Sequence, residues 1–146
     1  MTSATTLSIV IPALNEKASL VDLLPRLCAM GISTEIIIVD DGSSEDMGET
    51  CNRTNVRLIR HPHTKGNGAT IKTGARIATG EVILFMDADG QHRPEDIPAL
   101  IEKYREGYDM VVGARAIASQ AGIVAPSAIH FSTISLVGWL DTRLPI

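Results

Sequence analysis

The sequence predicts an α/β protein with a mostly parallel sheet flanked by helices. Five short segments are rich in Ile and Val, and segments of helical period separate them. Polar or glycine-rich residues follow each of the five apolar segments. Strands covered on both faces of a parallel sheet have nearly continuous apolar sequences. Their alternation with helices indicates a doubly wound sheet with right-handed crossovers.

The expected strands cover residues Leu7–Leu14, Glu35–Asp40, Val56–Arg60, Glu81–Met86 and Asp109–Val112. A helix is expected after each of the first four, because apolar side chains recur on one helical face or a capping residue is present. The clearest helical segments contain Leu20, Leu23, Leu24, Leu27 and Cys28, then the range Asn67–Thr79, then Ile97, Leu100, Ile101 and Tyr104. Residues Ser43–Asn52 predict a weaker helix, opened by Ser43 or Ser44.

Length and composition are those of a single globular domain. The chain has 146 residues, of which 45% are hydrophobic and 21% charged, as in ordinary soluble proteins. The net charge of −4 argues against nucleic-acid binding, for which a basic surface is expected. Cys28 and Cys51 form no C-x-x-C pair, and no export leader or long apolar run is recognisable. We therefore expect reduced thiols, no transmembrane helix and a cytoplasmic location.

Polar residues gather where the five predicted strands end. These strand ends read PALNE, DDGSS, HPHTKGNG, DADGQH and GAR along the chain. In open parallel sheets, ligands bind beyond the carboxyl ends of the strands. Because those ends meet at one edge of the sheet, the sequence predicts a binding site there.

Two aspartates, Asp87 and Asp89, follow the fourth apolar segment. Residues i and i+2 of an extended chain point the same way, so both carboxylates can face one cavity. Their like charges would repel each other unless a cation neutralises them. Mg²⁺ or Mn²⁺ suits such a pair and commonly completes its shell with phosphate oxygens. Gln91 offers a further oxygen, His92 is expected to be a loop residue, and a solvated acidic turn is the alternative.

Further candidates end the other strands. Asp41 could accept hydrogen bonds from a nucleobase, and Asp40 could do the same or brace the turn. The motif KGNG precedes a helix whose N-terminus favours anions, so Lys65 and Gly68 are candidates for phosphate contact, although basic residues there can also serve solubility. Arg115 ends the fifth segment and offers forked donors for a phosphate, with a surface salt bridge as the alternative.

The order and spacing of the motifs are informative as a set. They run VIPALNE, IIIVDDGSS, KGNGATIKTGARIATGEVILFMDADGQHRPEDIP and VVGAR along the chain. In this order they resemble family-2 glycosyltransferases with the GT-A fold, above all the dolichyl-phosphate mannosyltransferase-like branch, over residues 5–122. The resemblance implies transfer of a sugar from a nucleotide-diphosphate sugar donor to a polyprenyl phosphate, by a single metal-assisted inverting displacement. It implies Mg²⁺ or Mn²⁺ as cofactor, and membrane contact only through the lipid-linked acceptor.

The resemblance also implies a role for each matching position. The nucleoside would be held by Pro12, Ala13, Asn15, Glu16, Asp40 and Asp41. Asp89 and Gln91 would bind the metal, with Asp87 near the ribose or the metal, and Arg115 would meet the phosphates. Asp89 and Arg115 would act in catalysis, because the metal and Arg115 stabilise charge on the leaving nucleoside diphosphate. An acceptor phosphate is already an anionic nucleophile and needs no general base.

Residues beyond 122 depart from the family pattern. The stretch Ala116–Leu140 contains no Asp, Glu, Lys or Arg, and the last two dozen residues do not match the acceptor-site elements that members of this branch usually carry. We therefore expect a nucleotide-sugar-binding domain at residues 1–122 and a divergent or truncated tail at residues 123–146. A catalytically idle nucleotide-sugar-binding remnant is the alternative to an active enzyme.

Two other classes with paired aspartates fit less well. Haloacid-dehalogenase-like phosphatases carry D-x-D-x-T/V near the N-terminus, whereas here the motif lies in mid-chain and Gln91 stands at its fifth position. Response-regulator receivers carry their acidic pair at the end of the first strand, whereas Asp40 and Asp41 end the second. The glycosyltransferase resemblance is therefore the better hypothesis.

Overall fold

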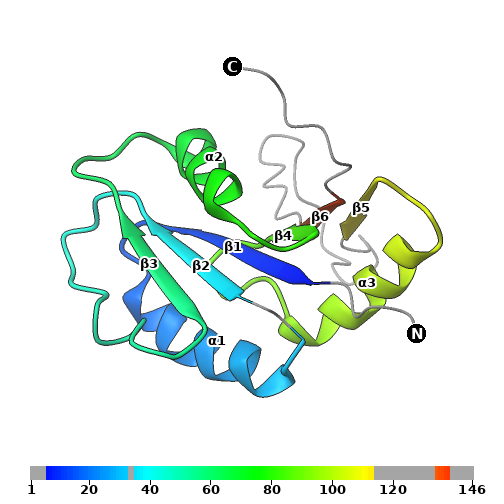
Figure 1. Cartoon of the computed structure of the whole chain (residues 1–146). Helices are drawn as coiled ribbons and strands as arrows, with labels where there is room; N and C mark the ends of the chain where they lie inside the picture. Colours follow the sequence, from blue (N-terminus) through cyan, green and yellow to red (C-terminus); the bar gives the residue numbers. More distant parts are fainter. Residues whose placement is uncertain (1–5, 33–34, 114–133, 139–146) are drawn as a thin grey trace, which may run out of the picture.

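The structure, a computed structural model, describes residues 6–32, 35–113 and 134–138. Within these residues six strands form one sheet with helices on both faces (Figure 1). The strands are β1 (Leu7–Ala13), β2 (Glu35–Asp40), β3 (Val56–Arg60), β4 (Val82–Phe85), β5 (Met110–Gly113) and β6 (Ile134–Gly138). The helices are α1 (Lys17–Met30), α2 (Asn67–Ile77) and α3 (Ile97–Arg105), the last preceded by the 3₁₀ helix η1 (Pro94–Asp96). The α/β class with a mostly parallel sheet is confirmed.

The strand order β3-β2-β1-β4-β6-β5 places β1 where the direction of chain progress reverses. The chain builds outward from β1 through β2 to β3, and then returns to β4 on the other side of β1. These four strands are mutually parallel, with Val10 opposite both Ile37 and Phe85. Ligand crevices form at such a switch point, beyond the carboxyl ends of the strands.

Strand β6 lies between β4 and β5 and is antiparallel to both. The sequence pattern predicts no strand at residues 134–138, which it assigns to the divergent tail. The expected fifth strand, β5, therefore joins the sheet through β6 rather than beside β4. A short apolar run inside a charge-free stretch gives little local signal, because period alone does not separate a buried strand from other buried structure.

The weak helix predicted over Ser43–Asn52 is wrong, because this segment consists of bends and turns. Side chains satisfy its backbone locally. Asp40 Oδ1 accepts the N–H of Ser43 at 2.9 Å, and Asp46 Oδ1 accepts the N–H of Gly48 at 2.9 Å. Such bonds from Asp and Ser side chains compete with helix formation.

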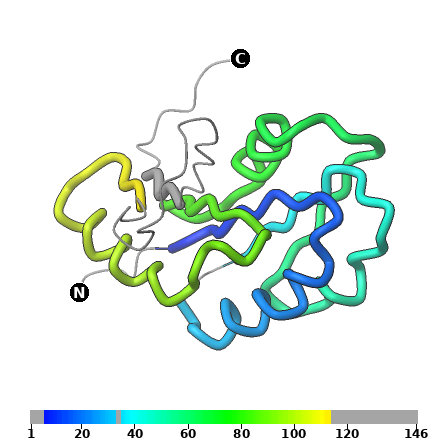
Figure 2. The backbone as a smooth tube through the Cα atoms, turned by 180° about the vertical axis from the view of Figure 1, so that it is seen from behind, coloured from blue at the N-terminus to red at the C-terminus, as the bar shows by residue number. Residues whose placement is uncertain are grey.

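The apolar core lies in two layers, one on each face of the sheet. Helices α1 and α3 cover one face, where Ile9, Leu24 and Ile36 are among the fully buried side chains. Helix α2 covers the other face, over Val10 and Ile37. Figures 1 and 2 show α2 on the opposite side of the sheet from α1 and α3. Because both faces are covered, the strands between them are apolar on both sides, as the sequence pattern predicts.

The described helices are too short to cross a membrane, and the two cysteines are not joined. A helix needs about 20 apolar residues to cross a bilayer. The longest of the described helices, α1, has 14 residues, and none of them has the length and apolar character that a membrane span requires. Cys28 is half-buried and Cys51 is buried, and neither forms a disulfide.

Candidate functional site

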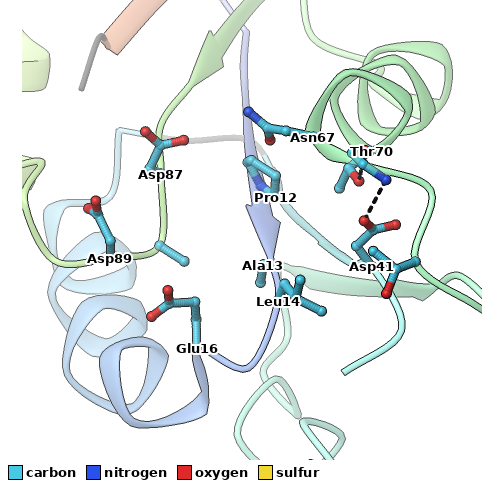
Figure 3. Close-up of a pocket in the computed structure, with 12 residues that line it drawn as sticks. Pro12, Ala13, Leu14, Glu16, Asp41, Asn67, Thr70, Asp87 and Asp89 are labelled. Atoms are coloured by element: carbon cyan, nitrogen blue, oxygen red, sulfur yellow. Dashed lines mark hydrogen bonds between the residues drawn. The ribbon is translucent and has the colours of Figure 1, made fainter. Parts of the chain in front are cut away.

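A pocket of about 300 Å³ opens at the carboxyl ends of β1, β2 and β4, where the topology predicts a crevice. It is lined by Pro12, Ala13, Leu14, Glu16, Asp41, Thr64, Gly66, Asn67, Thr70, Asp87, Ala88 and Asp89. Figure 3 shows Asp87 and Asp89 at one end and Asp41 with Thr70 at the other. We refer to these as the acidic end and the Asp41 end.

The structure brings about half of the sequence-predicted residues into this pocket. Those that line it are Pro12, Ala13, Glu16, Asp41, Asp87 and Asp89. Asn15, Asp40, Lys65, Gly68 and Gln91 are not among the lining residues, and Arg115 lies outside the described residues. Residues that the sequence did not single out also line it, namely Leu14, Thr64, Asn67, Thr70 and Ala88. Asn67 and the further lining residue Gly66 belong to the KGNG motif, and Thr64 and Thr70 lie close to it in the sequence, so this motif is the signal that could have identified them.

Two local hydrogen bonds shape the loop at the acidic end. The N–H of Asp87 donates to Nδ1 of His92 at 2.8 Å, and the N–H of Gln91 donates to Asp89 Oδ1 at 2.9 Å. His92 is buried beneath the loop. Gly90 has a φ of 77°, a conformation that side-chain-bearing residues adopt at a cost. The loop thus turns back on itself and leaves both carboxylates on the pocket wall.

The electrostatics of the acidic end suit a bound cation. Burial raises the pKa of the Asp87 carboxyl above its usual value; nearby His92 lowers it and the charge of Asp89 raises it. A cation between Asp87 and Asp89 would offset both the burial and the repulsion. One or two carboxylates completed by substrate phosphates is a common way of binding Mg²⁺. Among the described residues, no group of three or more His, Cys, Asp and Glu side chains is placed to hold a metal ion.

Asp41 is the most highly connected side chain of the Asp41 end. Its Oδ1 accepts hydrogen bonds from His61 Nδ1 at 2.7 Å and from the N–H of Lys65 at 2.9 Å, and its Oδ2 accepts the N–H of Gly66 at 2.8 Å. Burial by itself would raise the pKa of Asp41, but these hydrogen bonds lower it to about 2. Asp41 is therefore ionised at neutral pH and can only accept hydrogen bonds.

The anion at the N-terminus of α2 is the side chain of Asp41. The sequence makes the KGNG loop a candidate for phosphate contact, because helix N-termini favour anions. In the structure, the amides of Lys65 and Gly66 instead bind the Asp41 carboxylate. Thr70 supports the same turn, because its hydroxyl donates to the Gly66 carbonyl at 2.8 Å. Contact of Lys65 or Gly68 with a phosphate remains a prediction.

Asp40 and Asn15 brace the turns beneath the pocket. Asp40 is fully buried, its Oδ1 accepts the Ser43 N–H, and its Oδ2 lies 3.4 Å from Nε of Arg60. Asn15 has a φ of 56°, and its Oδ1 accepts the N–H of Ser44 at 3.0 Å. The turn after β1 is thereby tied to the turn after β2, which fixes the floor of the site.

Known proteins of one family are similar to this chain. The model of the family described as Glycosyl transferase family 2 matches residues 8–143. The chain is 37% identical over 116 residues to a dolichol-phosphate mannosyltransferase of Pyrococcus furiosus, covering 75% of this chain and 33% of that protein. It is 40% identical over 114 residues to an undecaprenyl-phosphate 4-deoxy-4-formamido-L-arabinose transferase of Klebsiella pneumoniae, covering 71% and 35%. The chain thus spans about a third of the length of these curated relatives.

Solved structures share the fold. A mannosyltransferase of Pyrobaculum calidifontis in complex with GDP-Man and Mn²⁺ superposes with a TM-score of 0.55 at 21% identity, over 60% of this chain and 28% of that one. A glucosyl-3-phosphoglycerate synthase of Mycobacterium tuberculosis, in complex with Mn²⁺, UDP and glucosyl-3-phosphoglycerate, gives 0.62 at 24% identity, over 74% and 42%. At these identities the likeness concerns the fold.

Proposed function

Because the chain belongs to glycosyltransferase family 2, we propose that it forms the donor-binding part of an enzyme that transfers a sugar from a nucleoside diphosphate to a polyprenyl phosphate. Its fold is the GT-A fold of its structural neighbours. The polyprenyl acceptor is suggested by two relatives of the chain, a dolichol-phosphate mannosyltransferase and an undecaprenyl-phosphate sugar transferase, which are 37% and 40% identical to it. The observation that carries the proposal is one pocket with the carboxylate pair of Asp87 and Asp89 at one end and the single ionised carboxylate of Asp41 at the other.

The two ends of the pocket suit the base and the diphosphate of a nucleotide sugar. At the Asp41 end, an ionised carboxylate faces the space where a base can donate a hydrogen bond. At the acidic end, Asp87 and Asp89 face the space where a diphosphate would place negative charge, which requires a cation between them. Pro12, Ala13 and the rest of the β1 turn form the wall between the ends, against which the ribose would lie.

A divalent cation, Mg²⁺ or Mn²⁺, would be held by Asp87 and Asp89, with Gln91 as a further candidate ligand. Structural neighbours were solved with Mn²⁺, and hard oxygen ligands suit both ions. When bound, the ion supplies positive charge that stabilises the leaving diphosphate. Arg115 is proposed to add a second positive charge on the phosphates.

The proposed displacement does not require the chain to supply a general base. The bond between the anomeric carbon and the diphosphate oxygen breaks, and its electron pair leaves with the nucleoside diphosphate. A phosphate oxygen of the acceptor forms the new bond from the opposite face, so the anomeric configuration inverts. Because that oxygen is already anionic, no proton has to be removed. The residues of the pocket therefore act by positioning the donor and by stabilising charge.

Titration calorimetry of the full chain with UDP-, GDP- and ADP-sugars, with and without Mn²⁺, tests the proposal. Metal-dependent binding of at least one of these donors is expected, and slow hydrolysis of that donor would support catalysis by the chain. Addition of undecaprenyl phosphate in detergent should then give a glycolipid product that thin-layer chromatography detects.

Other outcomes of this titration separate the alternatives. Binding without hydrolysis or transfer would favour a nucleotide-sugar-binding module without turnover. The absence of binding to all three donors, in the presence of Mn²⁺, would refute both proposals. UMP and GMP, which lack the second phosphate, serve as controls and should bind with little dependence on the metal.

A further inference from the structure

A buried histidine connects the Asp41 end of the pocket to helix α2. His61 follows β3 and is 5% exposed. Its Nδ1 lies 2.7 Å from Asp41 Oδ1, and its Nε2 lies 3.0 Å from Oγ1 of Thr73. Its own backbone N–H donates to the carbonyl of Asp40 at 2.8 Å. The imidazole is therefore fixed through its backbone and through both ring nitrogens.

These contacts determine how many further hydrogen bonds Asp41 can accept. Because an ionised carboxylate has no hydrogen to donate, the hydrogen between the two side chains belongs to Nδ1 of His61. A carboxylate has about four lone-pair sites. Oδ1 receives His61 and the N–H of Lys65, and Oδ2 receives the N–H of Gly66. One site remains, and it is on Oδ2.

We propose that His61 is a positioning residue that limits Asp41 to one hydrogen bond with the nucleobase of the donor. The inference rests on the proposed function, which places a nucleoside diphosphate in this pocket. A ring N–H of the lactam or imide type, such as N3–H of uracil or N1–H of guanine, fits the single acceptor. The second donor of guanine, its 2-amino group, then finds no acceptor on Asp41 and adds no affinity.

Two pairs of nucleotides isolate the donors concerned. GDP carries the 2-amino group that IDP lacks, and UDP carries a ring N–H where CDP has an acceptor nitrogen. For the wild-type chain with Mn²⁺, calorimetry is expected to give a GDP-to-IDP affinity ratio near one. UDP is expected to bind about tenfold or more tightly than CDP, because CDP would leave a charged acceptor unpaired.

His61→Gln and His61→Asn form a matched pair of variants. The amide nitrogen of Asn can occupy the position of Nδ1, whereas that of Gln reaches the position of Nε2, so Asn alone keeps the bond to Asp41. The released lone pair of Oδ1 gives guanine a second acceptor. His61→Gln is therefore expected to raise the GDP-to-IDP ratio about tenfold, and His61→Asn to leave it near one. A merely structural defect would weaken both nucleotides alike and leave the ratio unchanged.

The outcomes separate this inference from the proposed function. If neither these four nucleotides nor ADP bind the wild-type chain with Mn²⁺, the proposed function itself is refuted, whereas binding of ADP alone refutes only the contact of Asp41 with a lactam or imide N–H. If the four nucleotides bind with a wild-type GDP-to-IDP ratio of about ten or more, the single-acceptor role is refuted. An unchanged ratio in folded His61→Gln refutes it equally. The wild-type ratio requires no variant, so it decides the question if His61→Gln does not fold.

Discussion

Nδ1 of His92 accepts the backbone N–H of Asp87 at 2.8 Å, beneath the loop that carries both carboxylates of the acidic end. His92 is 4% exposed, so water does not compete for this bond. Because Nδ1 is the acceptor, a neutral ring carries its hydrogen on Nε2. The contact links the geometry of the metal-binding candidates to a residue that does not line the pocket.

Replacing His92 should therefore affect both stability and metal-dependent binding. His92→Leu leaves the Asp87 N–H without its partner, which is expected to cost about 1–3 kcal/mol of unfolding free energy. It should also weaken Mn²⁺-dependent nucleotide binding, because the loop is no longer fixed. His92→Asn can present its side-chain oxygen to the same N–H and should retain more of both properties. Urea unfolding and calorimetry measure them, and equal behaviour of the Leu and Asn variants would contradict this role.

Neutralising the acidic pair should abolish the metal dependence of nucleotide binding. In the double variant Asp87→Asn and Asp89→Asn, the charges that would hold the cation are gone, while the contacts at the Asp41 end persist. Weak binding that no longer responds to Mn²⁺ is expected in calorimetry, with an affinity at least about tenfold lower than that of the wild-type chain with Mn²⁺. Metal-dependent affinity that survives in the double variant would show that the cation is held elsewhere.

The depressed pKa of Asp41 predicts a loss of stability in acid. The hydrogen bonds in the fold outweigh burial and lower this pKa from 3.8 to about 2. The unfolded chain therefore binds a proton more readily than the folded one between these values. The stabilisation is complete above about pH 5 and is lost as the pH falls through 3.8 towards 2, by roughly 2 kcal/mol in total.

Unfolding by urea at a series of pH values checks this dependence. Asp41→Asn should lose about 1–3 kcal/mol at neutral pH, because an amide group meets the N–H donors of the loop, and its stability should vary less between pH 4 and 2. Glu45→Gln removes an exposed carboxylate and should retain the wild-type profile. An identical acid profile for wild type and Asp41→Asn would contradict the assignment.

The parallel part of the sheet could be predicted from the sequence because its signals are local. Segments such as Glu35–Asp40 are continuous in apolar β-branched residues, and the strand bounds agree with expectation to within a residue or so. The sequence pattern wrongly predicts a helix over Ser43–Asn52, because the acceptors that compete with helix formation are side chains whose orientation depends on tertiary structure. Strand β6 was missed because its partners, β4 and β5, are distant in sequence.

In the candidate site too, residues with a local sequence signal could be predicted, whereas contacts between distant residues could not. Asp87, Asp89 and Asp41 could be found because acidic residues after apolar strands are conspicuous. The bond between Asp41 and His61 could not, because the two residues are 20 positions apart and nothing in the sequence pairs them. The sequence makes the KGNG loop a candidate for phosphate contact, but the anion that the amides of Lys65 and Gly66 bind in the structure is a side chain of the protein, Asp41.

Glu35 offers a test of whether stability and binding can be separated. Glu35 is the first residue of β2, so it lies at the end of the strands opposite to the pocket. Its Oε1 accepts hydrogen bonds from Ser8 and Thr79, and its Oε2 accepts one from Arg57. Burial opposes ionisation, but these bonds prevail and lower the pKa of Glu35. Glu35→Gln should cost about 1–3 kcal/mol in urea unfolding and leave nucleotide affinity unchanged. A matching loss of affinity in the folded variant would contradict a purely structural role.

The close approach of α2 to β1 predicts opposite effects for two glycines of one helix. A Cβ on Gly74 would collide with Cγ1 of Val10, which is fully buried, whereas a Cβ on Gly68 would meet nothing within 4 Å. Gly→Ala in a helix gains about 1 kcal/mol from backbone entropy, but overpacking a core costs about 1–3 kcal/mol. Gly74→Ala should therefore destabilise the chain in urea unfolding, while Gly68→Ala stabilises it. If both variants were stabilised, the packing of α2 on Val10 would have to be looser than the structure shows.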